Sequence, residues 1–260
     1  MIAVIGAGAM GEALMAGWIA AGTSPDEIVA VDQDTDRLAR LRERRGVRSV
    51  EVSGVSVAEV VVVAVKPHHV ATALTDIAPH LGPDAVVVSV AAGVTLARLA
   101  EVLPEGQPVI RVMPNTPALV GRGVAGLAPG PTVAPGQTAR VMGMMEAVGI
   151  CVELPENQFD ALTAISGSGP AYLFLVAEAM IEAGVHQGLG RDVATRLVNG
   201  TFAGAAAMLE GVDASATELR ERVTSPAGTT AAALRVLDER AVRAAFLSAV
   251  EACARRSSEL

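Results

Sequence analysis

The stretch that decides the fold is Gly6-Ala7-Gly8-Ala9-Met10-Gly11, which lies between a short apolar run, Met1–Ile5, and a helical apolar pattern, Ala9–Ala21. The spacing G-x-G-x-x-G between a predicted strand and a predicted helix is typical of dinucleotide-binding βαβ units. The first glycine permits a tight turn, the second lets the backbone approach a pyrophosphate, and the third lets the helix pack closely on the strand. Phosphates bind at the helix N-terminus, where free N–H groups favour negative charge. The motif therefore predicts a dinucleotide site at the start of a parallel α/β sheet.

An acidic residue follows the second predicted strand, Ile28–Val31. Asp32 stands 21 residues after Gly11, where a carboxylate commonly accepts a hydrogen bond from the adenosine ribose 2′-hydroxyl. Such a carboxylate should repel a 2′-phosphate, so we expect NADH to be used at least as well as NADPH. The alternative is that Asp32 caps the next helix, although Asp34 and Thr35 also stand at cap positions.

The first 155 residues alternate strand-like and helix-like runs, which predicts a mostly parallel, doubly wound sheet. The valine-rich run Val60–Val65 is typical of a strand buried on both faces. Other strands are expected at Ala85–Val90 and Val109–Met113, and edge strands at Gly123–Leu127 and Ile150–Leu154. Helices are expected at Thr35–Arg45, Val70–Leu81 and Leu96–Leu103.

Near Pro155 the pattern changes to long Ala- and Leu-rich helical periodicity without a convincing strand. The expected helices are Tyr172–His186, Asp192–Glu210, Ala216–Val223, Thr230–Asp238 and Ala241–Arg255. We therefore predict a Rossmann-type α/β domain over residues 1–155 and an all-helical domain over residues 156–260. Small residues through Gly200–Ala207 predict close helix packing and extensive contact with another subunit.

The composition argues against several classes of protein. A formal net charge of −8 and 2% aromatic residues do not suit nucleic-acid binding, which needs basic surface and stacking side chains. Two cysteines, Cys151 and Cys253, give no disulfide framework or metal-ligand spacing, so we expect a reducing, cytoplasmic setting and no metal. We expect neither a secretory signal nor a membrane span, since there is no basic leader and no uninterrupted apolar run of about 18 residues.

Four further stretches resemble pyrroline-5-carboxylate reductases, in the order and spacing of that family and over nearly the whole chain. They are Ala64-Val65-Lys66-Pro67, Val112-Met113-Pro114-Asn115-Thr116-Pro117, Ser166-Gly167-Ser168-Gly169-Pro170-Ala171-Tyr172 and Thr224-Ser225-Pro226-Ala227-Gly228-Thr229-Thr230. The resemblance implies reduction of Δ1-pyrroline-5-carboxylate to L-proline, in proline biosynthesis, by hydride transfer from NADH or NADPH. It also implies a C-terminal helical domain that interlocks subunits as homodimers or larger homo-oligomers. The active site would form between the cofactor and the last of these stretches from a neighbouring helical domain.

The last stretch carries the implied catalytic residues. By resemblance, Ser225, Gly228 and Thr229 hold the substrate carboxylate, and the Thr230 hydroxyl lies near the ring nitrogen. A Ser/Thr/Gly turn at a helix start suits this role, because its N–H groups and hydroxyls are available to an anion. The alternative is an ordinary helix N-cap, which explains one hydroxyl but not several.

Other site residues follow from the remaining stretches. Ser166, Gly167 and Ser168 either let a helix start approach the substrate or simply begin that helix. Asp213 stands where the family has an acidic group before the last stretch, and helix capping is its alternative.

The remaining cofactor-binding residues are expected just after strands, at the carboxyl edge where ligands bind in open α/β sheets. They are Ala64, Val65, Lys66, Pro67, Ala91, Ala92 and Asn115. Lys66, the single lysine beside 19 arginines, is expected to approach the cofactor ribose or phosphate, or else to be a solvated loop residue. Asn115 or Thr116 is expected to face the nicotinamide amide, with a rigid turn as the alternative.

Three positions depart from the family pattern. Ala227 replaces a usual glycine, Val112 replaces a small residue, and Asp32 replaces the polar or basic residue of many relatives. A related cyclic imine in a specialised pathway is therefore an alternative substrate. A β-hydroxyacid dehydrogenase is another alternative, but such enzymes generally have a catalytic lysine in the helical domain, and no lysine follows Lys66. A non-catalytic dinucleotide sensor is the alternative from a different class, and the hydroxyl-rich loops argue against it.

Overall fold

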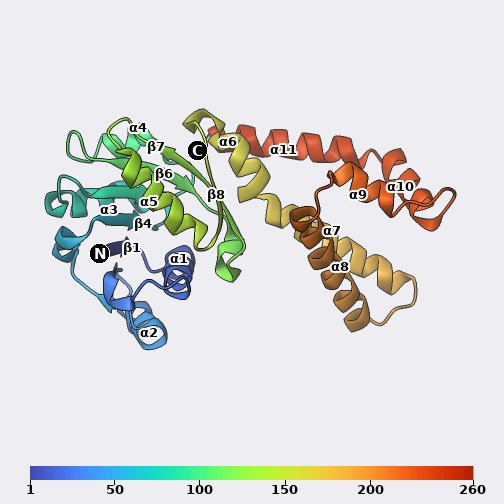
Figure 1. The fold of residues 1–260 in the computed structure, drawn as a ribbon, viewed down its shortest axis with the longest axis horizontal. Helices are drawn as coiled ribbons and strands as arrows, with labels where there is room; N and C mark the ends of the chain where they lie inside the picture. Colours follow the sequence, from blue (N-terminus) through green and yellow to red (C-terminus); the bar gives the residue numbers. More distant parts are fainter. Residues whose placement is uncertain (260) are drawn as a thin grey trace. The chain divides into compact units, whose positions relative to one another are not determined.

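The computed structural model describes residues 1–259 (Figure 1). The chain divides into two compact units. The first comprises Met1–Ser168 together with the C-terminal residues from Cys253, and the second comprises Gly169–Ala252.

An eight-stranded sheet organises the first unit, with the strand order β3-β2-β1-β4-β5-β6-β7-β8. The strands are β1 (Ile2–Ile5), β2 (Ile28–Val31), β3 (Arg48–Ser49), β4 (Val60–Val63), β5 (Val86–Ser89), β6 (Val109–Met113), β7 (Gly123–Pro129) and β8 (Gly149–Glu153). All neighbouring strands are parallel except β6 and β7. The predicted mostly parallel, doubly wound sheet is confirmed.

Helices cover both faces of this sheet. They are α1 (Ala9–Ala20), α2 (Thr35–Arg45), α3 (Val70–Ile77), α4 (Leu96–Ala100), α5 (Pro135–Glu146) and the short α6 (Phe159–Leu162). Because side chains alternate along a strand, Val4 packs with Trp18 of α1 and Met145 of α5 in one core. Ile5, the next residue, packs with Leu74 of α3 in the other core. The valine strand β4 is fully buried on both faces, as its sequence predicts.

One predicted position in the sheet is wrong. β7 was expected at an edge, but it lies between β6 and β8. Its small residues, among them Gly123 and Gly126, leave no room for large side chains, since a Cβ at Gly126 would lie 2.1 Å from Leu162. The sequence also gave no sign of β3, which has two residues, or of α5, which begins at Pro135 and contains Gly136 and Gly143.

The second unit is helical, and the described residues after Glu153 contain no strand. Its helices are α7 (Gly169–His186), α8 (Arg191–Gly211), α9 (Ala216–Arg222), α10 (Thr229–Glu239) and α11 (Val242–Ser258), the last of which ends in the first unit. α7 and α8 lie side by side (Figure 1). Gly184 permits this approach, because a Cβ there would lie 3.1 Å from the Cβ of Ala194.

Large apolar side chains are exposed on the helices of the second unit. α7 has no buried residue, and Phe174 and Leu175 are 69% and 66% exposed. The helical stretch Glu156–His186 is long and apolar enough to cross a membrane by length and composition. This stretch is not an uninterrupted apolar run, since Asp160, Glu178 and Glu182 lie within it. A single chain leaves this surface uncovered.

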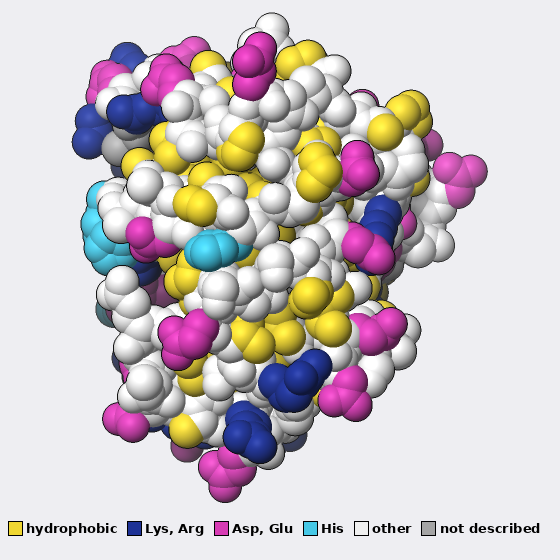
Figure 2. All heavy atoms as spheres, turned by 90° about the vertical axis from the view of Figure 1, so that its left-hand side faces the viewer, with side chains coloured by type: hydrophobic (Ala, Val, Ile, Leu, Met, Phe, Trp, Pro, Cys, Tyr) yellow, Lys and Arg dark blue, Asp and Glu magenta, His cyan; other side chains and the backbone are white. Residues whose placement is uncertain are grey.

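Charged side chains are spread over the face of the molecule drawn in Figure 2. Figure 2 shows one face, on which acidic and basic side chains are interspersed with apolar ones. The described residues on this face do not gather into a broad basic patch.

Candidate dinucleotide cavity and hydroxyl loop

A cavity of about 1430 Å³ opens at the carboxyl edge of the first unit's sheet. The loops that follow β1, β2, β4 and β5 line it. Eleven of the predicted cofactor-binding residues lie in this lining: Gly6, Gly8, Ala9, Met10, Asp32, Ala64, Val65, Lys66, Pro67, Ala91 and Ala92. The cavity is therefore formed where open α/β sheets bind ligands.

The glycines of the first loop have three different functions. Gly6 has a φ of +98°, and a Cβ there would lie 2.9 Å from the Ala64 carbonyl oxygen. A Cβ at Gly11 would lie 2.1 Å from the Gly6 carbonyl oxygen, so this glycine allows α1 to start against β1. Gly8 caps α1 without a side-chain hydrogen bond, and a Cβ there would meet no atom within 4 Å. The loop thus leaves open space in front of free N–H groups, which fits a pyrophosphate.

Asp32 is held by the chain itself. Its Oδ2 accepts from the Ala7 N–H at 2.7 Å, and its Oδ1 accepts from the Asp34 N–H at 2.9 Å. The alternative that Asp32 caps α2 is wrong, because Asp34 is the N-cap and accepts from the Arg37 N–H at 2.9 Å. Burial raises the pKa of Asp32, but the backbone amides of Asp34 and Ala7 and the Arg37 guanidinium outweigh it, so the pKa is lowered below its ordinary value. Asp32 is therefore a carboxylate at neutral pH.

Arg37 lines the cavity and was not predicted from the sequence. Its Nη1 lies 3.2 Å and 3.0 Å from the two carboxylate oxygens of Asp32, and its Nη2 lies 3.3 Å from Asp34 Oδ2. The available signal was its position in the first turn of a helix that follows two acidic residues, the N-cap Asp34 and Asp32 two positions before it. Among the 19 arginines of the chain that signal is weak, because the contact depends on the turn between β2 and α2.

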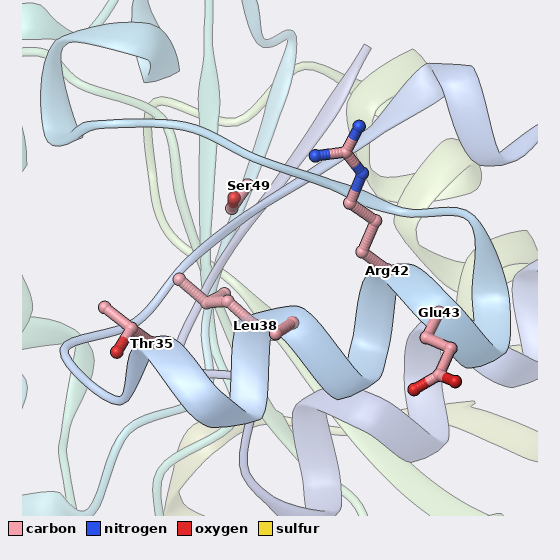
Figure 3. A pocket seen from close by; sticks show the side chains of 6 residues that line it. Thr35, Leu38, Arg42, Glu43 and Ser49 are labelled. Atoms are coloured by element: carbon pink, nitrogen blue, oxygen red, sulfur yellow. The ribbon is translucent and has the colours of Figure 1, made fainter.

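Other unpredicted residues complete the lining. They include Gln33, His69, Thr72, Asp76 and Leu119. A smaller cavity of about 560 Å³ lies along α2 and shares Thr35, Leu38 and Ser49 with the large one (Figure 3). The charged residues in its lining, Arg42 and Glu43, are consecutive on α2.

Either Asn115 or Thr116 is expected to face the nicotinamide amide, and the contacts of Asn115 leave Thr116 as the candidate. Asn115 is 6% exposed and does not line the cavity, whereas Thr116 does. Its Nδ2 donates to the Ser166 carbonyl at 2.9 Å, and its Oδ1 accepts from the Val124 N–H at 2.8 Å. The amide therefore joins the loop after β6 to β7 and to the turn before α7.

The predicted substrate residues before α7 are Ser166, Gly167 and Ser168. They lie in or next to a π-helical turn, in which the Ser168 N–H donates to the Thr163 carbonyl at 2.8 Å. The Ser166 hydroxyl donates to the carbonyl four residues before it at 3.0 Å, and the Ser168 hydroxyl lies 3.2 Å from Cys253 Sγ. π turns are frequent at functional sites. These three residues directly precede α7, as a helix-start signal predicts.

A partly buried ion pair anchors the segment that leads to this turn. The Arg111 side chain is 7% exposed, and its Nη1 lies 2.9 Å from Glu156 Oε1. The same carboxylate oxygen accepts from the Leu96 N–H at 2.7 Å, and the guanidinium lies 4.6 Å from the centre of the Phe159 ring. Sequence reasoning missed this cluster, because its members come from three segments that are far apart along the chain.

The hydroxyl loop of the second unit precedes α10. The N-cap of α10 is Gly228, without a side-chain hydrogen bond. No hydrogen bond within residues 1–259 uses the hydroxyls of Ser225, Thr229 or Thr230, so capping does not account for them. A Cβ at Gly228 would lie 2.3 Å from Ser225 Oγ, so a larger residue there would displace the Ser225 hydroxyl. Ala227 has a φ of +57°, a conformation that suits the glycine usual at this position better than an alanine.

Asp213 is exposed on the segment between α8 and α9. It does not cap α9, because Ser215 does, in a capping box with Glu218. Its helix-capping alternative is therefore wrong. Within the described residues, no group of three or more His, Cys, Asp or Glu could hold a metal ion.

Comparison with known proteins extends over both units. Residues 156–260 match the family model described as pyrroline-5-carboxylate reductase dimerisation, and residues 1–93 match the model described as NADP oxidoreductase, coenzyme F420-dependent. A pyrroline-5-carboxylate reductase of Corynebacterium melassecola is 45% identical over 100% of this chain and 98% of its own length. The Escherichia coli K12 enzyme of the same name is 36% identical over 100% of this chain and 97% of its own length.

A solved structure gives the same result. The pyrroline-5-carboxylate reductase of Coxiella burnetii superposes with a TM-score of 0.93 at 37% identity, over 99% of this chain and 97% of its own. Similarity of this extent in sequence and fold, over both units, includes the glycine loop and the hydroxyl loop alike. The chain therefore belongs to the pyrroline-5-carboxylate reductase family.

Proposed function

We propose that this protein reduces Δ1-pyrroline-5-carboxylate to L-proline with NADH or NADPH, as a step of proline biosynthesis. The observation that carries the proposal is that one chain has both an open dinucleotide cavity and a helix-start loop with unused hydroxyls. Relatives that match over the full length have this enzyme's name, and one solved relative, from Plasmodium falciparum, has NADP bound.

The cavity is proposed to hold the cofactor, with the pyrophosphate at the N-terminus of α1. A bound reduced nicotinamide supplies the hydride. Gly8 leaves the backbone amides accessible, and Lys66 is proposed to face the cofactor ribose or phosphate. Ala7 and Gly11 support the glycine loop from behind. Asn115 is proposed to hold the loop after β6 in place rather than to contact the cofactor.

The hydroxyl loop is proposed to bind the substrate. Ser225, Gly228 and Thr229 would hold the carboxylate, and the Thr230 hydroxyl would bind at the ring nitrogen. Hydride adds to the carbon next to this nitrogen, and a protonated imine is electrophilic without a strong enzymic acid. The protein's contribution is then proximity and orientation, which supply a large share of many rate enhancements.

Two further groups of residues are proposed to border the substrate. They are the turn of Ser166, Gly167 and Ser168, and the exposed carboxylate of Asp213. The π turn before α7 supports the first assignment, since such turns interrupt helices mainly where function requires it.

The assembly is proposed to be a homodimer or a larger homo-oligomer, built from residues 156–260. The exposed apolar side chains of α7 support a second copy of the chain as the partner, in preference to a membrane. The interspersed charges and the net charge of −8 support the absence of a nucleic-acid partner. Two free cysteines support a cytoplasmic location. We place the functional boundary between a cofactor domain, 1–155, and a helical domain, 156–260.

A substrate panel tests the proposal against its alternatives. Cofactor oxidation is followed with Δ1-pyrroline-5-carboxylate, with a six-membered cyclic imino acid and, in the reverse direction, with a β-hydroxyacid. We expect the five-membered imine to give the highest kcat/KM by at least tenfold. A higher kcat/KM with the six-membered imine would indicate a reductase of a related cyclic imine in a specialised pathway. Activity on the hydroxyacid alone would indicate a β-hydroxyacid dehydrogenase. Cofactor binding without any turnover would indicate a sensor.

A further inference from the structure

The carboxylate of Asp32 has no unoccupied position for a ribose hydroxyl. A carboxylate offers about four lone-pair sites. The N–H groups of Ala7 and Asp34 fill one on each oxygen, and Arg37 Nη1 reaches both oxygens, at 3.0 and 3.2 Å. The two backbone donors belong to the turns that build the cavity, so only the Arg37 side chain can leave without unfolding a loop.

The Arg37 side chain is exposed enough to change partners without unpacking the fold. It is 40% exposed, against 10% for that of Asp32, and both line the same cavity. Its other contact, with Asp34 Oδ2 at 3.3 Å, is a surface ion pair between similarly exposed side chains. Exposed pairs of this kind contribute little to stability. The helix does not need the guanidinium either, because Asp34 caps α2 through the backbone N–H of Arg37.

The charges around Asp32 determine the electrostatic environment of an adenosine ribose at this end of the cavity. Asp32 and Asp34 bring two negative charges to this end of the cavity, and Arg37 is the cation paired with both. A 2′-phosphate adds about −1.5 to −2 more at neutral pH. A guanidinium binds phosphate through parallel N–H groups, with better geometry than an ammonium.

We propose that Arg37 sets the cofactor range of this enzyme by exchanging partners. With a 2′-phosphate, Arg37 leaves Asp32 and pairs with the phosphate. With a 2′-hydroxyl, Arg37 moves aside and the hydroxyl donates to Asp32. The site therefore accepts NADPH in spite of Asp32, and Arg37 is the residue that makes this possible. The inference rests on the proposed assignment of the cavity to the cofactor.

The test is equilibrium binding of NADPH and NADH, followed by reduced-nicotinamide fluorescence without substrate. Arg37→Ala should weaken NADPH binding at least tenfold and change NADH binding by less than twofold, or strengthen it. Arg37→Lys should fall between the wild type and Arg37→Ala for NADPH. Arg40→Ala is the matched control, because Arg40 is an exposed arginine on the same helix outside the cavity lining, and both affinities should stay within twofold of the wild type.

The proposal would be overturned if Arg37→Ala weakened the binding of NADPH and NADH equally. It would also be overturned if Arg40→Ala weakened NADPH binding as much as Arg37→Ala does. Thermal unfolding identifies a variant that fails to fold, in which case Arg37→Gln is measured in its place. Because the assay needs no turnover, it is independent of the substrate. The wild-type protein could fail to reduce the imine while Arg37→Ala still weakens NADPH binding selectively. That result would support the role of Arg37 and reject the proposed reaction.

Discussion

At the scale of single residues, the polar side chains of Asp32 and Thr230 differ in whether the folded chain already supplies their hydrogen-bond partners. The Asp32 carboxylate is engaged by two backbone amides and one guanidinium. The Thr230 hydroxyl has no hydrogen-bond partner within the described residues, although it stands at a helix start. An engaged group can be exchanged between partners, as we infer for Asp32, whereas an unused hydroxyl is available to a ligand.

The first prediction concerns cofactor preference. Asp32→Ser should shift the ratio of kcat/KM values toward NADPH by about 1–2 kcal/mol, the size of one charge–charge contact at a dielectric close to that of water. Removing the carboxylate also frees Arg37 for the phosphate. The measurement is kcat/KM with each cofactor at saturating imine. A wild-type preference for NADPH of tenfold or more would contradict the effect ascribed to Asp32.

The second prediction concerns the hydroxyl of Thr230. Thr230→Ala should lower kcat/KM by about 1–3 kcal/mol, the usual contribution of a hydrogen bond to a charged partner. Thr230→Ser should keep most of the activity, because it retains the oxygen. Since Gly228 is the N-cap of α10, the thermal unfolding of both variants should match that of the wild type. Thr230 would be a structural residue if Thr230→Ala melted earlier yet reduced the imine normally.

At the scale of elements, sequence patterns predict the bounds of a helix or strand well where residues close together in the sequence determine its structure. The predicted bounds of β2, α2 and β6 agree with the structure to the residue. The Pro- and Gly-rich α5 and the internal place of β7 were missed, because packing against distant segments overrides local preference there. The same holds for the candidate site. The glycine loop could be predicted as a local sequence motif. The hydrogen-bond partners of Asn115 and the ion pair between Arg37 and Asp32 could not, because they depend on contacts between different segments.

The third prediction separates the roles of two glycines at the start of α1. Gly11→Ala places a Cβ 2.1 Å from the Gly6 carbonyl and should destabilise the fold by about 2 kcal/mol or more. Gly8→Ala meets open space at a φ of −68°, so the free energy of unfolding should change by no more than about 0.5 kcal/mol. Its methyl group should still weaken dinucleotide binding, measured by fluorescence titration. Normal NADH and NADPH affinity in a folded Gly8→Ala protein would remove this loop from the proposed phosphate site.

At the scale of the whole molecule, the helical residues expose apolar surface that a single chain does not cover. Large exposed apolar patches generally mark interaction surfaces. The family model for dimerisation matches this same part of the chain, residues 156–260. The proposed self-association would cover the exposed side chains of α7 and the apolar stretch Glu156–His186.

The fourth prediction is that the protein is at least a dimer at micromolar concentration. Phe174→Glu should dissociate it, because it places a charge on the exposed apolar surface of α7. Val57→Glu is the matched control, since Val57 is 65% exposed in the first unit, and this variant should remain associated. Light scattering coupled to size exclusion gives the mass of each. A wild-type monomer would contradict the assignment of the helical surface.

The fifth prediction is the reaction itself, measured as product formed per cofactor oxidised. The purified protein is incubated with Δ1-pyrroline-5-carboxylate and limiting NADH or NADPH, and L-proline is quantified by chromatography. The account predicts one L-proline for each reduced cofactor consumed, and no cofactor oxidation without the imine. Cofactor oxidation without proline, or no imine-dependent oxidation by a folded protein that binds the cofactor, would contradict it.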